Sequence, residues 1–479
     1  MTTYLFYDTE TTGLNKAFDQ VLQFAAIRSD MQFKEIERTS VRIRLRPDVI
    51  PSPQAIITNR ISVADFGSGV NEFEAIQQIH QLLNQPGTIS LGYNTMGFDD
   101  EFLRFAFHRN LLPPYTHQFH NGCRRMDLLP ITIICWLYKR AVLQWPEIDG
   151  KPSLKLEHLS TANRLVSGPS HDAGVDVAAT LELARKLASE KKMWDYLAGY
   201  FIKETDARRL EELPVSFQSV TGAHRLGLMV GSEFGFQQDF QVPVLFIGNS
   251  LPYPNQTLWL CLDRPDLPAT TSTRPDEKTW VIRKKLGEPG IVLPPHKRFW
   301  RQLGAPRRAI AEENLNWLQA RPEILQALVK YYREYRYPLV PNVDLDAALY
   351  QIGFLSRFEE KLCRQFHAAS WDERFELVDL FPNPETRALA RRILFRNYYD
   401  NLPPTRLAEF EAYMRRVNPA RAQDALVDHR GERRTTPAEA LGEIEQLRQT
   451  GELDHFQRRL LDELQDYILK NFSQKPIIG

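Results

Sequence analysis

The chain starts with a run of apolar and aromatic residues that ends in two acids, since residues 4–10 read YLFYDTE. Such a run before the turn residues 11–13 is typical of a β-strand, and two later segments, 21–27 and 40–45, are also strand-like. The three segments are close enough in sequence to form an antiparallel meander. A further strand at 88–93 then alternates with helical periodicity. The expected helices lie at 73–83, 99–109, 127–139 and 172–186. This order predicts a mixed-sheet α/β domain.

The pattern changes near residue 190, where short apolar runs are separated by turns rich in Pro, Asn and Gly. These strand-like runs lie at 215–220, 242–247 and 257–260. They predict a small β-rich domain, closed by helices within 309–335. After a Pro-containing segment at 336–341 the period becomes helical. The helical segments lie at 346–358, 388–398, 407–417 and 438–471. We therefore expect three domains, which a length of 479 residues favours. Their boundaries are 1–190, 191–341 and 342–479.

Charge and cysteine usage narrow the class of protein. Lys plus Arg and Asp plus Glu each number 60, so an anionic partner would have to meet local basic clusters. The cysteines lack C-x-x-C spacing, which argues against a zinc site and against a disulfide framework. They are Cys123, Cys135, Cys261 and Cys363. Neither a signal peptide nor a membrane-spanning segment is recognisable. We expect a cytoplasmic monomer with buried thiols.

The first candidate site lies on the first strand. Asp8 and Glu10 are two residues apart, so a strand directs both carboxylates to one face. Two such charges repel each other unless a cation lies between them, and a divalent metal held by oxygen ligands is the usual solution. Taken alone, a D-x-E pattern is more often a solvated strand end, because so short a pattern recurs by accident.

Further candidate residues lie where helices start. Asp99 begins the helix expected at 99–109, where an acid also serves as a cap or a first-turn residue. His171 and Asp176 flank the start of the helix expected at 172–186 and can face one cleft. Each motif alone is compatible with a surface or capping role. Together, D-x-E, N-x-x-x-F-D and H-x-x-x-x-D follow one another in an order that indicates a single composite site.

With these motifs the chain resembles the DEDD exonucleases of the histidine subtype, and over nearly its whole length the exonuclease I family. Further segments that carry the resemblance are FDDE at 98–101, DLL at 127–129, PSLKLEHLSTAN at 152–163, AAT at 178–180, NVD at 342–344 and LY at 349–350. The resemblance implies a ribonuclease-H-like exonuclease domain, an SH3-like β-rich domain and an all-α helical C-terminal domain.

The resemblance also implies roles at the site. Two Mg²⁺ ions, or Mn²⁺ as a substitute, would be held by four carboxylates and would drive phosphodiester hydrolysis. Asp8 would bridge both ions, Glu10 and Asp176 would complete the site nearest the attacking water, and Asp99 would bind the other ion. His171 would act as the general base, since an unperturbed histidine has a pKa of about 6.5.

The sequence indicates the residues that contact DNA less clearly than it indicates the metal ligands. Lys155 lies in the segment that approaches the scissile phosphate in this family, where relatives often have Arg. Thr58 matches a loop that borders the DNA. Arg104 lies on the helix expected at 99–109, and Tyr115 and Phe119 follow this helix. Together they supply the positive charge and the stacking surfaces that a single strand needs. Packing of the two aromatic rings in the core is equally compatible with the sequence. The expected contacts are Glu10, Thr58, Arg104, Tyr115, Phe119 and Lys155. Basic residues that could line a groove are Lys284, Lys285, Lys297, Arg298, Arg301, Arg391, Arg392, Arg396, Arg415, Arg416, Arg433 and Arg434.

We therefore expect a Mg²⁺-dependent 3′→5′ exodeoxyribonuclease that degrades single-stranded DNA to 5′-mononucleotides in DNA repair and recombination. The resemblance adds a partner, the acidic, Phe-ending tail of single-stranded-DNA-binding protein. Two alternatives stay open at this point: an RNA-trimming exoribonuclease, and a non-catalytic strand-binding scaffold on a nuclease fold. The scaffold predicts a lost ligand, whereas all five residues of the composite site are present.

Overall fold

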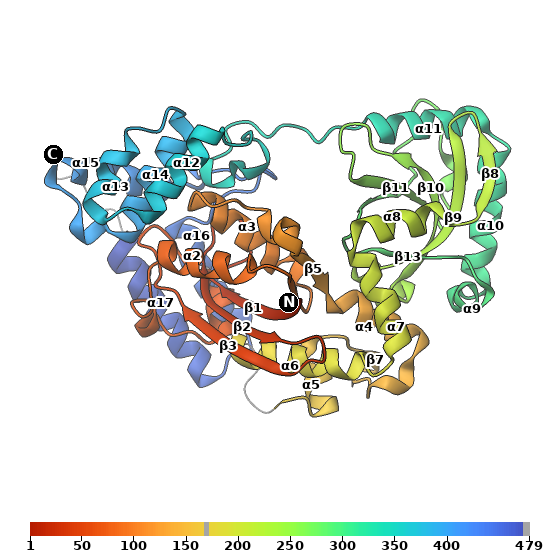
Figure 1. The fold of residues 1–479 in the computed structure, drawn as a ribbon, viewed down its shortest axis with the longest axis horizontal. Helices are drawn as coiled ribbons and strands as arrows, with labels where there is room; N and C mark the ends of the chain where they lie inside the picture. Colours follow the sequence, from red (N-terminus) through yellow and green to blue (C-terminus); the bar gives the residue numbers. More distant parts are fainter. Residues whose placement is uncertain (167–171, 473–479) are drawn as a thin grey trace.

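The computed structural model describes residues 1–166 and 172–472, which form three regions (Figure 1). The first region contains a five-stranded mixed sheet of order β3-β2-β1-β4-β5. Its strands are β1 (Thr3–Thr11), β2 (Val21–Ser29), β3 (Glu35–Arg42), β4 (Thr88–Gly92) and β5 (Arg124–Asp127). β1 is antiparallel to β2 and parallel to β4, so the expected meander and mixed sheet are confirmed.

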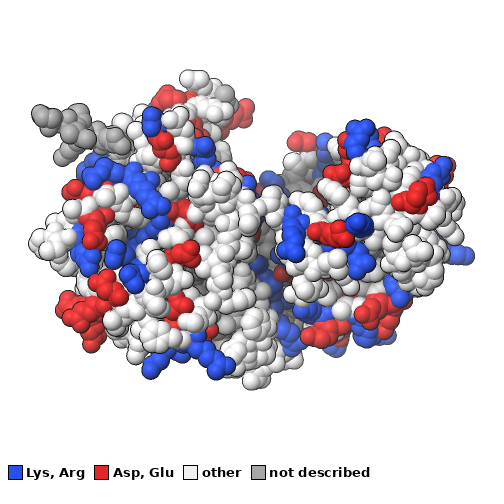
Figure 2. Space-filling model, turned by 90° about the horizontal axis from the view of Figure 1, so that it is seen from above, with Lys and Arg blue, Asp and Glu red and all other residues white. Residues whose placement is uncertain are grey.

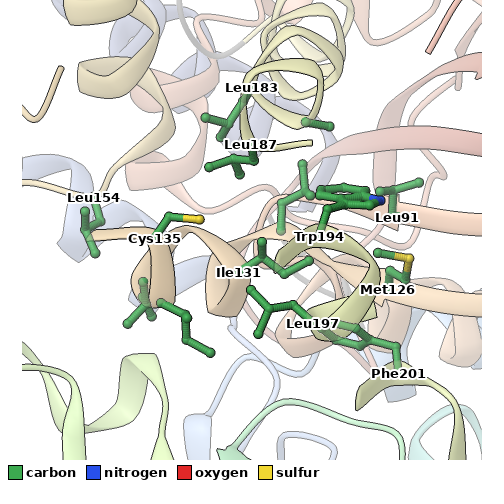
Figure 3. Close-up of a cluster of buried hydrophobic side chains, with 14 of the residues drawn as sticks. Leu91, Met126, Ile131, Cys135, Leu154, Leu183, Leu187, Trp194, Leu197 and Phe201 are labelled. Atoms are coloured by element: carbon green, nitrogen blue, oxygen red, sulfur yellow. The ribbon is translucent and has the colours of Figure 1, made fainter. Parts of the chain in front are cut away.

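Helices cover both faces of this sheet because the side chains of β1 alternate between two apolar cores. The helices of this region are α1 (Pro53–Asn59), α2 (Glu72–Leu83), α3 (Asp99–Arg109), α4 (Leu128–Tyr138), α5 (Leu156–Asn163) and α6 (Ala173–Leu187). Tyr4 and Phe6 pack toward α4 and α6, in the core that Figure 3 shows. Leu5 and Tyr7 pack toward α2 and α3 on the other face. A short hairpin adds β6 (Glu147–Ile148) and β7 (Lys151–Pro152).

One strand of this sheet differs from the prediction. The sequence predicts a strand at 40–45, whereas β3 starts at Glu35 and ends at Arg42. β3 is an edge strand whose side chains are mostly exposed. An exposed edge strand needs no apolar alternation, so its first half carries no signal in the sequence.

The middle region is β-rich, as expected, and contains an antiparallel sheet of order β12-β11-β10-β9-β13, with β8 paired to β9. Its strands are β8 (Val215–Ser219), β9 (Gly222–Val230), β10 (Gln241–Asn249), β11 (Gln256–Cys261), β12 (Val281–Lys285) and β13 (Ile291–Leu293). Its helices are α7 (Lys191–Ala198), α8 (Lys203–Glu211), α9 (Lys297–Trp300), α10 (Ala305–Gln319) and α11 (Pro322–Glu334). Leu325 and Leu328 of α11 pack onto Leu245 and Leu258 of the sheet.

The last region is helical, but two expected helical segments are divided. Residues 346–358 contain only a 3₁₀ helix, η11 (Leu345–Tyr350), before Ser356 caps the next α-helix. Residues 438–471 form two helices that are separated near Gly451. The helices are α12 (Arg357–Ala368), α13 (Trp371–Val378), α14 (Pro384–Asn397), α15 (Pro404–Val417), α16 (Pro437–Thr450) and α17 (His455–Phe472).

The apolar cores cross the expected domain boundaries. Trp194 and Leu197 of α7 pack with the core of the first sheet. Ile444 of α16 and Leu464 of α17 pack with Ile56 of α1. The boundaries at 190 and 341 therefore stay a prediction. Among the described residues, no helix is long and apolar enough to cross a membrane.

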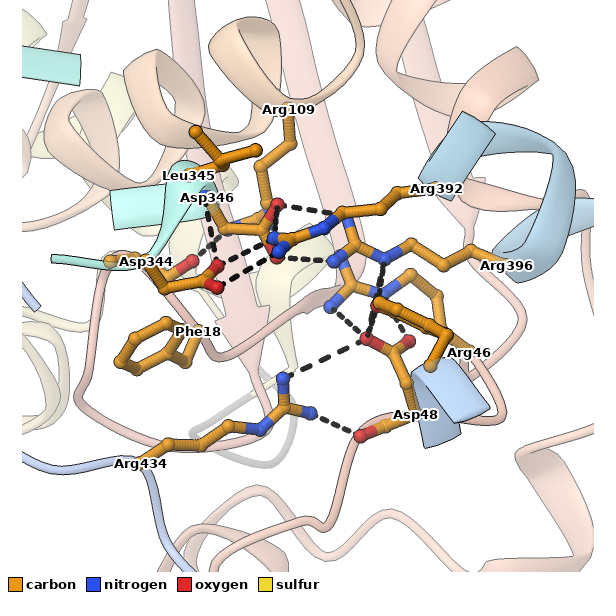
Figure 4. A network of polar contacts seen from close by, with 12 residues as sticks. Phe18, Arg46, Asp48, Arg109, Asp344, Leu345, Asp346, Arg392, Arg396 and Arg434 are labelled. Carbon is orange, nitrogen blue, oxygen red and sulfur yellow. Dashed lines mark hydrogen bonds and ion pairs between the residues drawn. The ribbon is translucent and has the colours of Figure 1, made fainter. Parts of the chain in front are cut away.

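A buried ionic network also joins the last region to the first (Figure 4). Asp48 accepts hydrogen bonds from Arg46 Nε at 3.0 Å and from the Tyr413 hydroxyl at 2.8 Å. It also lies 3.3 Å from Arg396 Nε. Glu72 pairs with Arg46 at 2.9 Å, so one arginine joins two acids of the first region.

The network continues through two acids at the start of the last region. Asp344 binds Arg392 through both carboxylate oxygens, at 2.5 and 2.8 Å. Asp346 pairs with Arg392 at 3.0 Å and also with Arg396. Because Arg396 also reaches Asp48, the acids of the two regions share one arginine.

Arg109 carries the network to the loop that follows β1. Its Nη2 lies 3.1 Å from Glu72, and its Nη1 donates to the carbonyl of Ala17 at 2.6 Å. The side chain is fully buried. The helical region is thereby connected to the loop beside the strand that carries Asp8 and Glu10.

Candidate active site

Asp8 and Glu10 extend past the end of the neighbouring parallel strand. β4 pairs with β1 only as far as Phe6, opposite Leu91, whereas β2 continues to pair opposite both acids. Asp8 and Glu10 have the same parity along β1 as Phe6, so they face α6. A cleft at the carboxyl end of parallel strands is a frequent ligand site in α/β sheets.

α6 brings the third carboxylate. Asp172 is the N-cap of α6, and its Oδ1 accepts hydrogen bonds from the backbone N–H groups of Gly174 (2.9 Å) and Val175 (3.2 Å). This cap fixes the first turn, which contains Asp176. The structure brings three acids together: carboxylate oxygens of Asp8, Glu10 and Asp176 lie within 4.8 Å of one another.

Asp99 reaches the same place from the start of α3. Its Oδ1 accepts hydrogen bonds from the hydroxyl of Thr9 at 2.5 Å and from the backbone N–H of Thr9 at 3.1 Å. Asp127 holds the preceding turn, because its carboxylate accepts from the backbone N–H groups of Asn94 (2.9 Å) and Met96 (3.1 Å). Asp99 is therefore fixed against the strand that carries the other acids.

The electrostatics of the four acids suit a divalent cation. Burial raises the pKa of Asp8 well above its usual range, and the charges of Asp99, Glu10 and Asp176 raise it further. Burial, followed by the charges of Asp176 and Asp99, raises the pKa of Glu10 to about 9. Burial also raises the pKa of Asp99, although the hydrogen bonds from Thr9 oppose this shift. Oxygen ligands that repel one another in this way fit Mg²⁺ or a similar hard cation.

His171, the predicted general base, lies outside the described residues. Lys155 is the N-cap residue of α5, and its side chain is exposed, with Nζ 3.6 Å from Glu157 Oε1. Thr58 lies in α1, and its hydroxyl donates to the carbonyl of Gln54 at 2.8 Å. The roles of His171, Lys155 and Thr58 at the site stay predictions.

The three other expected DNA contacts differ in exposure. Arg104 is buried, and its Nε and Nη2 donate to Asp100 Oδ2 at 2.9 and 2.6 Å. Its guanidinium lies 6.0 Å from the centre of the half-buried Tyr115 ring. Phe119 is 69% exposed, which leaves its ring open to stacking. Arg104 therefore has a structural partner at the start of α3, while Phe119 keeps the surface that a base would need.

Several of the basic residues expected along a groove are instead buried partners of acids. Lys284 Nζ donates to Asp206 Oδ2 at 2.7 Å inside the middle region. Arg391 is half-buried and lies 3.4 Å from Asp379. Three further members are buried in the network of Figure 4, namely Arg392, Arg396 and Arg434. The groove prediction is therefore wrong for Lys284, Arg392, Arg396 and Arg434, whereas the place of the half-buried Arg391 stays a prediction. The exposed members of the expected set are Lys285, Lys297, Arg298, Arg301, Arg415, Arg416 and Arg433.

Sequence reasoning missed residues that position the site. Asp172 could have been found as a cap, because an acid directly before a helical period is an N-cap signal. Thr9 binds Asp99, which is 90 residues away, and Asp127 binds an irregular turn. No local pattern marks a side chain whose partner is distant.

Arg125 was missed for the same reason. Its Nη1 donates to Asp100 Oδ2 at 2.5 Å and its Nη2 donates to Glu288 Oε1 at 2.9 Å. Asp100 directly follows Asp99, and Glu288 belongs to the β-rich region. Arg125 therefore links the start of α3 to the middle region.

Comparison with known proteins identifies the family of the chain. The model of the exonuclease family RNase_T matches residues 5–184. Exodeoxyribonuclease I of Escherichia coli (strain K12) is 38% identical over 378 residues, which cover 74% of this chain and 77% of that protein. The structure of E. coli exonuclease I in complex with a dA16 oligonucleotide has a TM-score of 0.81 at 24% identity, covering 98% of this chain and 100% of that chain. The zinc-ion-bound form of the E. coli complex with single-stranded DNA has a TM-score of 0.79 at 24% identity and covers the same shares. The chain therefore belongs to the exodeoxyribonuclease I family of exonucleases.

Proposed function

We propose that this protein is a Mg²⁺-dependent 3′→5′ exodeoxyribonuclease that degrades single-stranded DNA to 5′-mononucleotides by a two-metal-ion mechanism. The observation that carries the proposal is the cluster of Asp8, Glu10 and Asp176, whose carboxylate oxygens lie within 4.8 Å of one another. Asp99 lies beside it, bound to Thr9. These acids come from three separate elements, so the cluster is a product of the fold and not of one strand end.

The four acids and His171 would have distinct roles in the reaction. Asp8, Glu10, Asp99 and Asp176 would hold two Mg²⁺ ions. When bound, such ions lower the pKa of water and stabilise charge on the phosphate and on the leaving oxygen. Thr9 of β1 orients the Asp99 carboxylate by donating two hydrogen bonds to it. His171 would take the proton of the attacking water, an assignment that rests on the sequence motif.

The relatives support the choice of substrate. E. coli exonuclease I has been solved with a dA16 oligonucleotide and, in a zinc-bound form, with single-stranded DNA. We therefore propose that the substrate of this chain is single-stranded DNA and not RNA. We also propose that the chain uses a divalent metal. A role in DNA repair and recombination, a monomeric state in the cytoplasm and docking of the acidic tail of single-stranded-DNA-binding protein are proposed on the same family basis.

The test is digestion of single-stranded DNA labelled at either its 3′ or its 5′ end. With Mg²⁺, the wild-type protein should release labelled mononucleotides at once from the 3′ end and shorten 5′-labelled strands stepwise. Asp8→Asn and His171→Ala should lose this activity. Asp266→Asn, at an exposed position of the middle region, is the matched control and should retain it. Release from the 5′ end, or faster digestion of RNA of the same sequence, would refute the proposal.

A further inference from the structure

A second cluster of aromatic and basic side chains lies at the end of α11, in the middle region. Residues 330–337 read KYYREYRY, so three basic residues are opposed by one acid, Glu334. The rings form a continuous set, in which Tyr335 lies 5.7 Å from Tyr337, measured between ring centres. Further ring pairs join Tyr331 to Tyr332 and to Tyr335, and Tyr253 to Tyr337.

Arg283 of β12 lies at the centre of this cluster. Its guanidinium carbon is 4.3 Å from the ring centre of Tyr335, 5.6 Å from that of Tyr332 and 5.8 Å from that of Tyr337. Within the described parts of the chain, Arg283 has no side-chain hydrogen bond or ion pair, so rings and not an acid hold its guanidinium. Such an arginine retains its capacity to bind a phosphate.

Exposure distinguishes this cluster from an apolar core. Tyr337 is 49% exposed and Tyr331 is 36% exposed. Asp276 accepts a hydrogen bond from the Tyr331 hydroxyl at 2.8 Å. Tyr337 is anchored through its backbone, because its N–H donates to the Tyr253 hydroxyl at 3.0 Å. A fixed aromatic ring with exposed surface beside basic groups is what an unpaired base needs for stacking.

The position of the cluster agrees with a DNA strand that runs between two lobes of the molecule. One lobe is the middle region, and the other consists of the first and last regions (Figure 1). Tyr337 lies on the linker that leaves α11 and crosses to the helical region, and this linker passes over the space between the lobes in Figure 1. Figure 2, seen from the linker side, shows a hollow between the lobes with Lys and Arg side chains along it. The cluster belongs to the middle region, whereas the four acids belong to the first.

We propose that Tyr331, Tyr335, Tyr337 and Arg283 form a stacking platform that binds nucleotides of single-stranded DNA upstream of the 3′ end. Bases stack on the tyrosine rings while Arg283 contacts the backbone. The platform goes beyond the proposed function and rests on it, since its occupant is the remainder of the same strand. Long strands reach both the carboxylates and the platform, whereas short strands reach only the carboxylates.

The test compares binding of a long and a short oligothymidylate, of about 30 and about 6 nucleotides. Fluorescence anisotropy in the Asp8→Asn background avoids digestion of the probe. The measured quantity is the ratio of Kd for the short strand to Kd for the long strand. Tyr337→Ala should reduce this ratio about tenfold, because loss of one stacked base costs about that factor. Tyr337→Phe keeps the ring and should retain the ratio.

Two further variants sharpen the result. Arg283→Gln should lower the slope of log Kd against log salt by about one for the long strand, as expected for one lost phosphate contact. Tyr196→Ala is the matched control, because Tyr196 on α7 is 42% exposed and the guanidinium of Arg209 lies 4.1 Å from its ring centre. An unchanged ratio in Tyr337→Ala, or an equal reduction in Tyr196→Ala, would overturn the platform. Absence of binding at both lengths would overturn the proposed function as well.

Discussion

Glu10 illustrates how burial and neighbouring acids act on one residue of the carboxylate cluster. Its side chain is buried, and its pKa rises from 4.5 to about 9 through burial and the neighbouring acids. Between these two values the folded chain binds more protons than the unfolded chain, so the free energy of unfolding falls as pH rises. Below the unfolded value both states are protonated, and the stability is retained in full.

We therefore expect the metal-free protein to lose thermal stability as pH rises from about 5 to about 9, and Mg²⁺ to restore it at the upper end. Differential scanning calorimetry with and without Mg²⁺ measures both effects. Glu10→Gln should flatten the metal-free profile and raise Tm at a pH of about 8, because the folded chain no longer has to keep protonated a carboxyl that is ionised in the unfolded chain. Glu182→Gln, at a position of α6 that is 35% exposed, is the control and should keep the wild-type slope. A metal-free Tm that does not change with pH would contradict the prediction.

The residues that sequence analysis placed well are those whose geometry is local. Asp8 and Glu10 share a face because a strand has a period of two, and nothing distant changes that. Lys284 and Arg392 were expected along a groove because the sequence shows a charge but not its partner. The partners are acids 78 and 48 residues away that are buried with them.

α6 connects the fold to the site at the scale of an element. Asp172 accepts two backbone hydrogen bonds at its first turn, which also carries Asp176. Asp172→Ala should lower the free energy of unfolding by about 1 kcal/mol and weaken Mg²⁺ binding, because fraying of this turn displaces one carboxylate. Chemical denaturation and isothermal titration calorimetry with Mg²⁺ measure the two effects.

The control for this prediction is the cap of a helix in another region. Ser356 caps α12 in a capping box with Glu359, so Ser356→Ala should cost a similar free energy of unfolding. It should leave the affinity for Mg²⁺ unchanged. Equal loss of metal affinity in both variants would show that general destabilisation, and not the position of Asp176, controls the affinity.

Helix boundaries show the limit of periodicity at this scale. A helix was predicted at 99–109, and α3 spans Asp99–Arg109. The helix expected at 346–358 was wrong, because a 3₁₀ helix ends at Tyr350 and a new N-cap at Ser356 starts the next helix. An apolar period continues through such a break, whereas the caps that create the break depend on backbone geometry.

The ionic network of Figure 4 determines how the whole molecule holds together. Burial alone would raise the pKa of Asp48 and of Asp346, but the surrounding arginines lower each pKa well below its usual range. Such acids stabilise the fold above their unfolded pKa of about 4, and this stability is lost as pH falls below that value. Acid should therefore loosen the contact between the helical region and the first region.

Asp48→Asn tests this prediction at neutral pH. It leaves Arg46 and Arg396 with one acid fewer in a buried site, which should cost about 3–5 kcal/mol of unfolding free energy. Limited proteolysis should then cleave the helical region faster than in the wild-type protein. Asp379→Asn is the control, since Asp379 is 57% exposed and pairs with arginines near the surface at 3.4 and 3.5 Å. Equal proteolysis rates in the two variants would argue against this role of Asp48.

The order of the three regions was readable from the sequence because the hydrophobic period changes twice along the chain. The way the regions join was not readable. The contact of Ile56 with Leu464 depends on tertiary packing that no local period encodes. The link from Arg125 to Glu288 is of the same kind, since each residue taken alone has the pattern of a solvated charge.

The pairing of charges in the ionic network also affects how the chain can fold while it is being synthesised. The portion made first contains Arg46 and Arg109 together with Asp48 and Glu72, so its charges cancel before any later residue exists. Asp344 and Asp346, supplied after residue 340, pair with Arg392 and Arg396 of the same portion. Arg434 is the exception, because its buried guanidinium meets its acid, Asp48, only when the later portion joins the first. The nascent chain can fold its first sheet during synthesis and join the two portions only when α14 has emerged.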